Sequence, residues 1–216
     1  MLSRLDPEAR RLLLRVPVAA AAALLIWFAG GSEVYGRTLA AATEAVLRAF
    51  ESRPVTFLSW EDNTVQIRRS DFSSRSQIPV FRPASVTGNA VLLLALYLST
   101  PGAGTRKGLV RGALALGVLF LTHIVHFALA IETIYATQLG AWSVYAYERW
   151  QREIVASGRY FFDIALKYAL PFVVWGVFVM LPLLKVREDE VAAAAARAAR
   201  EEPTTWRQRR KLRRRK

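Results

Sequence analysis

The fold is decided by residues 83–131, which read PASVTGNAVLLLALYLSTPGAGT (83–105), RKGLVR (106–111) and GALALGVLFLTHIVHFALAI (112–131). The two long runs contain no Asp, Glu, Lys or Arg. A membrane-spanning helix needs roughly 20 mostly apolar residues, so both runs qualify. The short basic segment between them predicts an antiparallel helical hairpin, which also carries the only two histidines of the chain, His123 and His126.

Composition indicates a membrane protein with a basic tail. Of the 216 residues, 53% are hydrophobic, and the mean hydropathy is +0.21. The net charge is +13, and residues 185–216 contribute +7 of it, with twelve Lys or Arg against five Asp or Glu. This uneven distribution argues against a nucleic-acid binder that is basic throughout. The absence of cysteine excludes disulfides, Cys-ligated metals and a cysteine nucleophile.

The N-terminus predicts a retained first helix. Residues 1–15 are basic, and residues 16–32 run without charge. A secretory signal peptide is the competing interpretation, because it also has a basic start and small residues. The basic region is long for a signal and contains Asp6 and Glu8. Since positive flanks remain in the cytoplasm, we expect the N-terminus and the loop 106–111 to be cytoplasmic.

The first outside segment, residues 33–82, predicts a small α+β insertion. Apolar residues recur at helical spacing over 34–51, which favours an amphipathic helix. Residues 55–60 and 64–68 are rich in β-branched and aromatic residues, and Glu61-Asp62-Asn63 lies between them. This pattern predicts a β-hairpin.

The second outside segment, residues 132–158, contains clustered Trp and Tyr, which favour a short interfacial helix. The last span follows, and Pro171 should kink it. A cytosolic helix then runs to Pro203, before the basic tail. The prediction is an all-α membrane protein with both termini inside and four transmembrane helices, at 16–32, 83–105, 112–131 and 159–184.

Polar side chains within the spans predict the candidate site, because such groups are costly in the bilayer. Given the expected topology, six of them lie near the outer ends of the second, third and fourth spans. We expect one outward-facing polar cluster in the outer third of the bilayer. Its members are Thr87, Asn89, His123, His126, Asp163 and Lys167.

Simpler interpretations of these residues remain open. Asp163 and Lys167 are spaced i, i+4 and can neutralise each other, or Lys167 can extend to the head groups. The histidines can be packing residues with hydrogen bonds to neighbouring helices. A metal site needs a third ligand, which the spacing does not supply. Thr87 as a nucleophile needs a base within reach.

The basic tail has two interpretations. It is a positive-inside anchor attracted to anionic lipid, or it contacts RNA, although it has only Trp206 as an aromatic for base stacking. The residues that would make these contacts are Arg207, Arg209, Arg210, Lys211, Arg213, Arg214, Arg215 and Lys216. We expect no contact with DNA.

The segment Val86-Thr87-Gly88-Asn89, the following hairpin and the ending His123-Ile124-Val125-His126 resemble the core of exosortases and archaeosortases, membrane transpeptidases that process C-terminal sorting signals. The resemblance implies a cysteine near position 86 or 87, Asn and Arg at 123 and 126, and a histidine within 158–162. This chain has none of these residue types there. The resemblance therefore argues against transpeptidase activity.

The layout over residues 16–184 looks like that of the exosortase H-associated membrane proteins, which are non-catalytic companions of a sorting transpeptidase. This resemblance implies a non-enzymatic accessory protein of the bacterial inner membrane, without cofactor or metal, whose partners are the bilayer and an exosortase-type enzyme or its substrates. The hairpin edges would allow an extended peptide to bind by β-augmentation. The alternatives are a divergent intramembrane hydrolase using Thr87 and His126, and a small scaffold or transport subunit.

Overall fold

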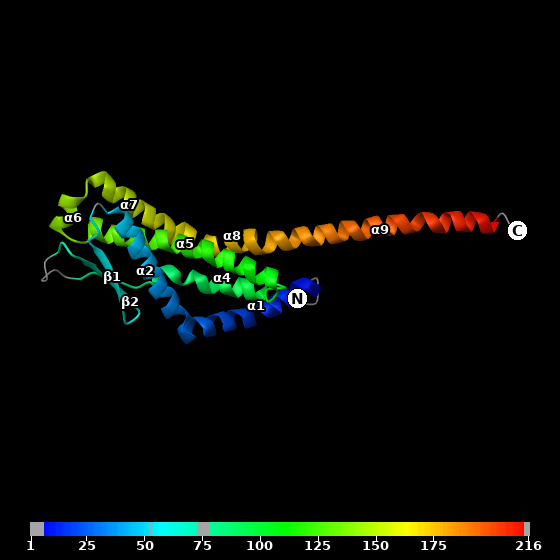
Figure 1. The fold of residues 1–216 in the computed structure, drawn as a ribbon, viewed down its shortest axis with the longest axis horizontal. Coiled ribbons are helices and arrows are strands. Elements are labelled where there is room, and N and C mark those ends of the chain that lie inside the picture. Colours follow the sequence, from blue (N-terminus) through cyan, green and yellow to red (C-terminus); the bar gives the residue numbers. More distant parts are fainter. Residues whose placement is uncertain (1–6, 52, 73–77, 214–216) are drawn as a thin grey trace.

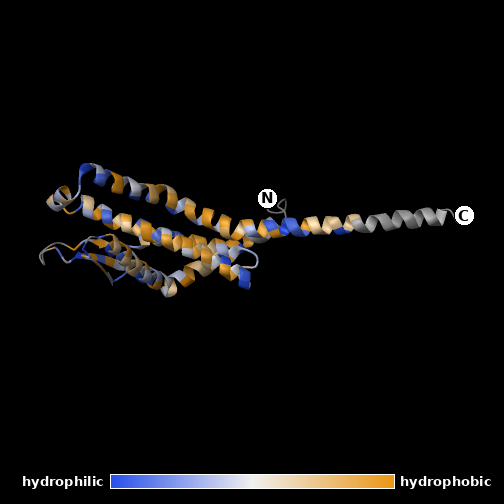
Figure 2. Cartoon of the chain, turned by 45° about the horizontal axis from the view of Figure 1, so that its top comes forward, coloured by the Kyte–Doolittle hydropathy of each residue, from blue (hydrophilic) through white to orange (hydrophobic). Residues whose placement is uncertain are grey.

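The computed structural model describes residues 7–51, 53–72 and 78–213, and describes side-chain surroundings from residue 14 to residue 199 within them. Figure 1 shows a helical bundle with a small sheet near one end and one long helix leaving the other end. Three helical stretches are long and apolar enough to cross a membrane: Leu14–Phe50, Arg106–Thr137 and Arg149–Ala199. Hydrophobic residues run along the bundle in Figure 2. A mostly helical membrane protein is thus confirmed, with three candidate spans among the described residues and one shorter apolar helix, Ala84–Ser99.

The second predicted span is shorter than expected. It consists of α3 (Ala84–Thr87) and α4 (Asn89–Ser99). The helix ends because Thr100 is extended, Pro101 lacks an N–H group, and Gly102 has a φ of +78°. Residues 100–105 therefore form the connection to the next helix.

The predicted loop at 106–111 is wrong, since these residues form the first turns of α5 (Arg106–Thr137). Thr105 starts this helix as its N-cap, and its Oγ1 accepts a hydrogen bond from the Gly108 amide at 3.1 Å. The helix also continues to Thr137, beyond the predicted end at residue 131. It continues because several side chains of this last part are buried against the rest of the fold.

The N-terminal span is α1 (Pro7–Ile26), followed by a π-helical turn (Trp27–Gly31) and α2 (Ser32–Phe50). The helix that contains the predicted span 16–32 begins earlier, at Pro7, because the polar start of the chain is also helical. Gly30 has a φ of +122° and produces the kink between α1 and α2, a backbone conformation that glycine adopts easily. The predicted amphipathic helix matches α2 within two residues.

The predicted hairpin is present as β1 (Thr56–Glu61) and β2 (Thr64–Arg69). Asp62 and Asn63 both have positive φ, which suits a two-residue turn that follows the twist of the strands. A third strand, β3 (Val80–Phe81), pairs with β2 and was not predicted. All pairings are antiparallel, in the order β1-β2-β3.

The last helical stretch begins earlier and ends later than predicted. Residues 132–158 contain the predicted short helix as α6 (Ala141–Ala146), and they also include most of α7 (Arg149–Phe161), which was not predicted. Glu148 and Gln151 start α7 with a reciprocal capping box.

Beyond α7, the helical stretch continues without a break. Two π-helical turns, Phe162–Leu166 and Gly176–Met180, flank α8 (Lys167–Trp175). We expected a kink at Pro171 itself. The irregularities are instead these two turns, one on either side of the proline. The helix then passes Pro203, where we expected it to end, as α9 (Leu181–Arg213).

Two hydrophobic clusters lie along α5. One joins the C-terminal half of α5 to α2 and the sheet, and its fully buried members include Leu39, Ile67 and Phe127. The other joins the N-terminal half of α5 to α4 and α8 through Leu93, Leu119 and Val174. Helix α5 is therefore the central element that both halves of the fold share.

Two glycines of α5 allow close packing at the inner end of the bundle. A Cβ at Gly108 would lie 2.2 Å from the Gly102 carbonyl oxygen. A Cβ at Gly112 would lie 2.6 Å from the Tyr97 ring, whose hydroxyl donates to the Ala103 carbonyl at 2.6 Å. Both the loop and α4 thus approach α5 where it lacks side chains.

We expect Gly112→Ala to lower the apparent Tm in detergent by roughly 3–10 °C, because overpacking costs about 1–3 kcal/mol. The matched control is Gly117→Ala in the same helix, where an added Cβ meets nothing within 4 Å. The control should leave Tm unchanged or raise it, since Ala is the better helix former. Equal effects of the two substitutions would contradict the packing role of Gly112.

Candidate functional site

A chain of hydrogen bonds inside the bundle connects four helices through His123. The Tyr35 hydroxyl of α2 lies 2.7 Å from His123 Nδ1, and His123 Nε2 lies 2.7 Å from Asn89 Oδ1 of α4. Asn89 Nδ2 then donates to the Lys167 carbonyl oxygen of α8 at 2.8 Å. His123 itself is on α5 and is only 2% exposed.

The Lys167 carbonyl oxygen determines which atom donates in each of these hydrogen bonds. A carbonyl oxygen only accepts, so the Asn89 amide nitrogen donates and its oxygen remains an acceptor. His123 Nε2 must therefore carry the proton that it donates to Asn89. In the neutral imidazole, Nδ1 is then an acceptor and receives the Tyr35 hydroxyl proton. Each group has a partner in this arrangement, which is what burial in the bilayer requires.

Pro171 explains why the Lys167 carbonyl is free to accept from Asn89. In an α-helix this carbonyl would bond to the amide four residues later, at position 171. Proline has no N–H group, so the acceptor is left without its usual partner. Asn89 supplies the missing donor from a neighbouring helix. The proline in one span and the asparagine in another thus act together.

The second histidine forms an ion-pair geometry with the last span. His126 Nε2 lies 3.0 Å from Asp163 Oδ1, and Arg159 Nε lies 3.4 Å from Asp163 Oδ2. The Phe162 ring stacks on the His126 imidazole at 5.2 Å between centroids. Asp163 and Phe162 both belong to the π-helical turn Phe162–Leu166, and such turns are frequent at functional sites in helices.

The structure brings together most of the predicted polar cluster. Asn89, His123, His126 and Asp163 contribute side chains, and Lys167 contributes its carbonyl, while its ammonium lies 5.7 Å from the Tyr168 ring centroid. Thr87 stays apart, because its hydroxyl donates to the Pro83 carbonyl one turn earlier in the chain.

Two members of the cluster were missed by sequence reasoning. Tyr35 lies 88 positions before His123, in a segment that we assigned to the outside insertion. Arg159 lies at the boundary between the predicted outside loop and the last span. Its spacing of four from Asp163 was the available signal.

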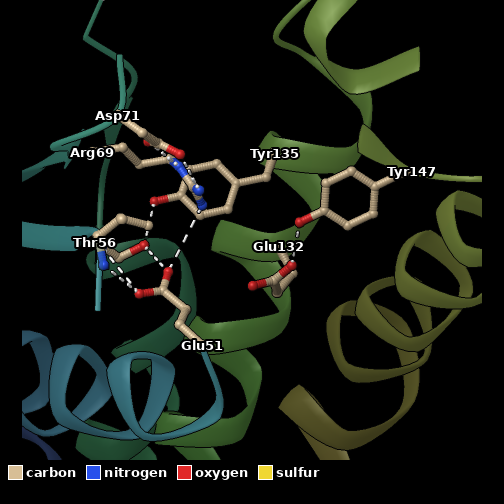
Figure 3. Close-up of polar contacts among 8 residues, drawn as sticks. Glu51, Thr56, Arg69, Asp71, Glu132, Tyr135 and Tyr147 are labelled. Atoms are coloured by element: carbon tan, nitrogen blue, oxygen red, sulfur yellow. Dashed lines mark hydrogen bonds and ion pairs between the residues drawn. The ribbon is translucent and has the colours of Figure 1, made fainter. Parts of the chain in front are cut away.

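A separate polar network holds the sheet against the outer end of α5 (Figure 3). Glu51, directly after α2, accepts from the backbone amides of Val55 and Thr56 at 2.8 and 3.2 Å. The Thr56 hydroxyl donates to the other Glu51 carboxylate oxygen at 2.5 Å and lies 3.0 Å from the Tyr135 hydroxyl. One carboxylate therefore ends α2, starts β1 and connects both to α5.

Arg69 is the centre of this network. Its guanidinium makes two hydrogen bonds to Asp71, at 2.9 and 2.8 Å, and lies 3.7 Å from Glu51. The same group lies over the rings of Tyr135 and Trp142, 4.9 and 5.1 Å from their centroids. Its side chain is only 13% exposed, so the protein's own arginine fills this aromatic site. The Arg69 hydrogen bonds hold the pKa of Asp71 below its usual value of 3.8.

A third contact connects α5 to the chain after α6. The Tyr147 hydroxyl donates to Glu132 at 2.7 Å. Burial and the neighbouring Glu132 carboxylate raise the pKa of Tyr147 well above its usual value, so it stays a donor at neutral pH. Glu132 thereby gains a hydrogen bond at its partly buried position.

The sheet edges are less open to peptide binding than the sequence indicated. The Leu58 amide of β1 donates to Glu44 of α2 at 2.8 Å, and the Thr56 amide donates to Glu51. On the other side, β2 is covered by β3, which is two residues long and lies between Pro79 and Pro83. Charged caps, short strands and prolines all block edge pairing, so β-augmentation is disfavoured here.

Among the described residues, no group of three or more His, Asp and Glu side chains is arranged to hold a metal ion. The side chains of the predicted tail site fall outside the described part. Arg207, Arg209, Arg210, Lys211 and Arg213 lie in the helical backbone of α9, and Arg214, Arg215 and Lys216 lie outside the described residues.

Comparison with family models, curated proteins and solved structures returned no match for this chain.

We expect Asn89→Ala to destabilise the bundle by about 1–2 kcal/mol, because interhelical hydrogen bonds in membranes contribute about 0.6 kcal/mol on average and two are lost. The measurement is unfolding by SDS titration from mixed micelles. In a Pro171→Ala background, the new amide can satisfy the Lys167 carbonyl, so Asn89→Ala should cost about 0.5–1 kcal/mol less.

The matched control is Thr87→Val, which removes a hydroxyl that bonds only within its own helix. It should cost less than about 0.5 kcal/mol. Strict additivity of Asn89→Ala and Pro171→Ala would show that the two residues are not coupled through Lys167.

The Arg69–Asp71 contact predicts a pH dependence of the outer region. A carboxyl whose pKa is lower in the folded state contributes stability above its unfolded pKa, and this contribution is lost as the pH falls through the folded value. We expect Tm to fall below about pH 4, modestly because Asp71 is 43% exposed. Asp71→Asn should lower Tm at pH 7 and weaken the acid dependence, whereas Asp62→Asn at the hairpin turn should leave the profile unchanged.

Proposed function

We propose that this protein is a non-catalytic integral membrane accessory protein of an exosortase-type sorting system, and that it scaffolds a partner enzyme or presents its substrate in the bilayer. The layout of spans and outside segments supports this role. The absence of cysteine in the chain argues against a transpeptidase of its own. The bacterial inner membrane is the corresponding location.

We further propose that the helix Ala84–Ser99 is a fourth crossing. At 1.5 Å per residue it measures about 24 Å, which is short for a lipid-exposed span. Its contacts with α1, α5 and α8 enclose it within the bundle, where irregular ends are tolerated. Four crossings place all the basic flanks in the cytoplasm and the sheet outside.

The observation that carries the proposal is that the intramembrane polar groups are paired with one another across helices. Tyr35, Asn89 and His123 form one connected chain, and His126 pairs with Asp163. Groups engaged in this way fix the relative positions of helices. They favour a rigid scaffold over a reaction centre with an open position for substrate.

The outward faces of the last helical stretch provide a docking surface next to this cluster. Several large apolar side chains there are more than half exposed: Tyr160, Phe161, Ile164, Tyr168, Phe172 and Val173. Helices in membranes associate through such packing surfaces. We propose that a partner's transmembrane helices cover this face.

The second candidate, a divergent intramembrane hydrolase, is favoured by the His126–Asp163 pair, which has the geometry of a base and its orienting carboxylate. The Thr87 hydroxyl that would act as nucleophile is bonded to the Pro83 carbonyl. Loss of function in Thr87→Ala would support the hydrolase, and unchanged function would remove it.

The test uses site-specific photo-cross-linking in native membranes. Because the chain has no cysteine of its own, a single introduced cysteine is its only attachment point for the photoreactive group. Ile164→Cys probes the proposed face, and Leu25→Cys in α1 is the matched control, since both side chains are 72% exposed. We expect Ile164→Cys to cross-link to one polytopic membrane enzyme, identified by mass spectrometry, and the control to give lipid adducts. Lipid adducts alone at both positions would overturn the proposal.

A further inference from the structure

Lys167 is a cation of the last helical stretch that no carboxylate of the described residues neutralises. The nearby Asp163 carboxylate pairs with His126 at 3.0 Å and with Arg159 at 3.4 Å. The Lys167 ammonium makes no ion pair with any residue whose surroundings the structure describes, and it lies 5.7 Å from the centroid of the Tyr168 ring. Asp163 and Lys167 therefore do not neutralise each other, although their spacing of four would allow it.

Hydrogen bonds place the backbone of Lys167 level with the central part of α5. Its carbonyl oxygen accepts from Asn89, and the Asn89 side chain in turn accepts from His123. On α5, residues 112–131 contain no charged side chain, and His123 is the twelfth of these 20 residues. The uncharged run is about 30 Å long, which is the thickness of the hydrocarbon core of a bilayer. In a bilayer that matches this run, the backbone of Lys167 lies well inside the hydrocarbon.

The lysine side chain is too short to carry its charge out of this region. A lysine near the end of a span extends its ammonium toward the head groups. The four methylene groups of Lys167 span roughly 6 Å. The C-terminal end of the uncharged run lies eight residues beyond His123, which corresponds to about 12 Å. The ammonium therefore remains beside apolar side chains, where a charge is costly unless an opposite charge meets it.

This charge belongs to the docking surface proposed above. Lys167 is half-buried, and the Tyr168 ring next to its ammonium is 64% exposed. Ile164, which is 72% exposed, is its neighbour one turn earlier on the helix. A helix that packs on Ile164 and Tyr168 would therefore cover the ammonium as well. An uncharged helix would leave this cation buried without a counter-charge, so the surface favours a partner that brings a carboxylate.

We propose that a transmembrane helix of the partner presents an Asp or Glu side chain to Lys167 within the docking surface. The two groups would form an ion pair in a region of low dielectric, where the attraction between opposite charges is strong. The pair also gives specificity, because a helix without the carboxylate leaves the ammonium unpaired. This inference rests on the proposed accessory role and adds the chemistry by which the partner is recognised.

The first experiment varies Lys167 in the photo-cross-linking assay with Ile164→Cys. Lys167→Met removes the charge at similar length and should lower the yield of the partner adduct at least about fivefold. Lys167→Arg keeps the charge and should retain most of the adduct. The matched control is Lys185→Met, at an exposed lysine of the same helical stretch, which should leave the yield unchanged. Lys167→Met keeps the carbonyl that accepts from Asn89, so its Tm in detergent should change by less than about 2 °C.

The second experiment reverses the two charges. Mass spectrometry identifies the cross-linked segment of the partner, which should contain an Asp or Glu. Changing that residue to Lys should remove the adduct, and adding Lys167→Asp should restore it. A cross-linked segment without a carboxylate, or equal yields with Lys and Met at position 167, would overturn this inference and leave the accessory role standing. Lipid adducts alone with Lys167 in place would overturn the accessory role, and this inference with it.

Discussion

The bundle depends on one side-chain amide, that of Asn89. Its oxygen accepts from His123 on α5 and its nitrogen donates to the Lys167 carbonyl on α8, so a single group satisfies two partners in a region without water. The carbonyl needs this donor because Pro171 lacks an N–H group. Tyr35 then extends the same chain to α2. The relative positions of four helices follow from hydrogen bonds that the bilayer makes obligatory.

Helix α5 connects this chain of hydrogen bonds to the sheet. His123 and His126 lie in its central part, and Glu132 and Tyr135 lie near its C-terminal end. Tyr135 meets both Thr56 and Arg69, so the sheet is fixed to the same helix that orders the spans. The same network blocks the edge of β1. Glu51 accepts a hydrogen bond from a β1 amide and also contacts Arg69.

Much of this fold could be predicted from local sequence patterns. Contacts between residues far apart in the sequence could not be predicted in this way. The turn residues Asp62 and Asn63 identified the hairpin, and apolar periodicity identified α2. The depth argument brought His126 and Asp163 into one layer, and they lie 3.0 Å apart. Strand β3 was missed because two residues between prolines carry no period, and it exists through its pairing with β2. Tyr35 was missed because its partner is 88 positions away.

The hydrogen bonds of the two histidines support the scaffold role proposed above. A catalytic base must be free to take a proton from a bound substrate. His123 uses both ring nitrogens in bonds to Tyr35 and Asn89, so a proton transfer there would break contacts that hold helices together. His126 binds Asp163 in a π-helical turn, at the side of the bundle where apolar residues remain uncovered. In the proposed accessory role, His126 would help to position the docking surface.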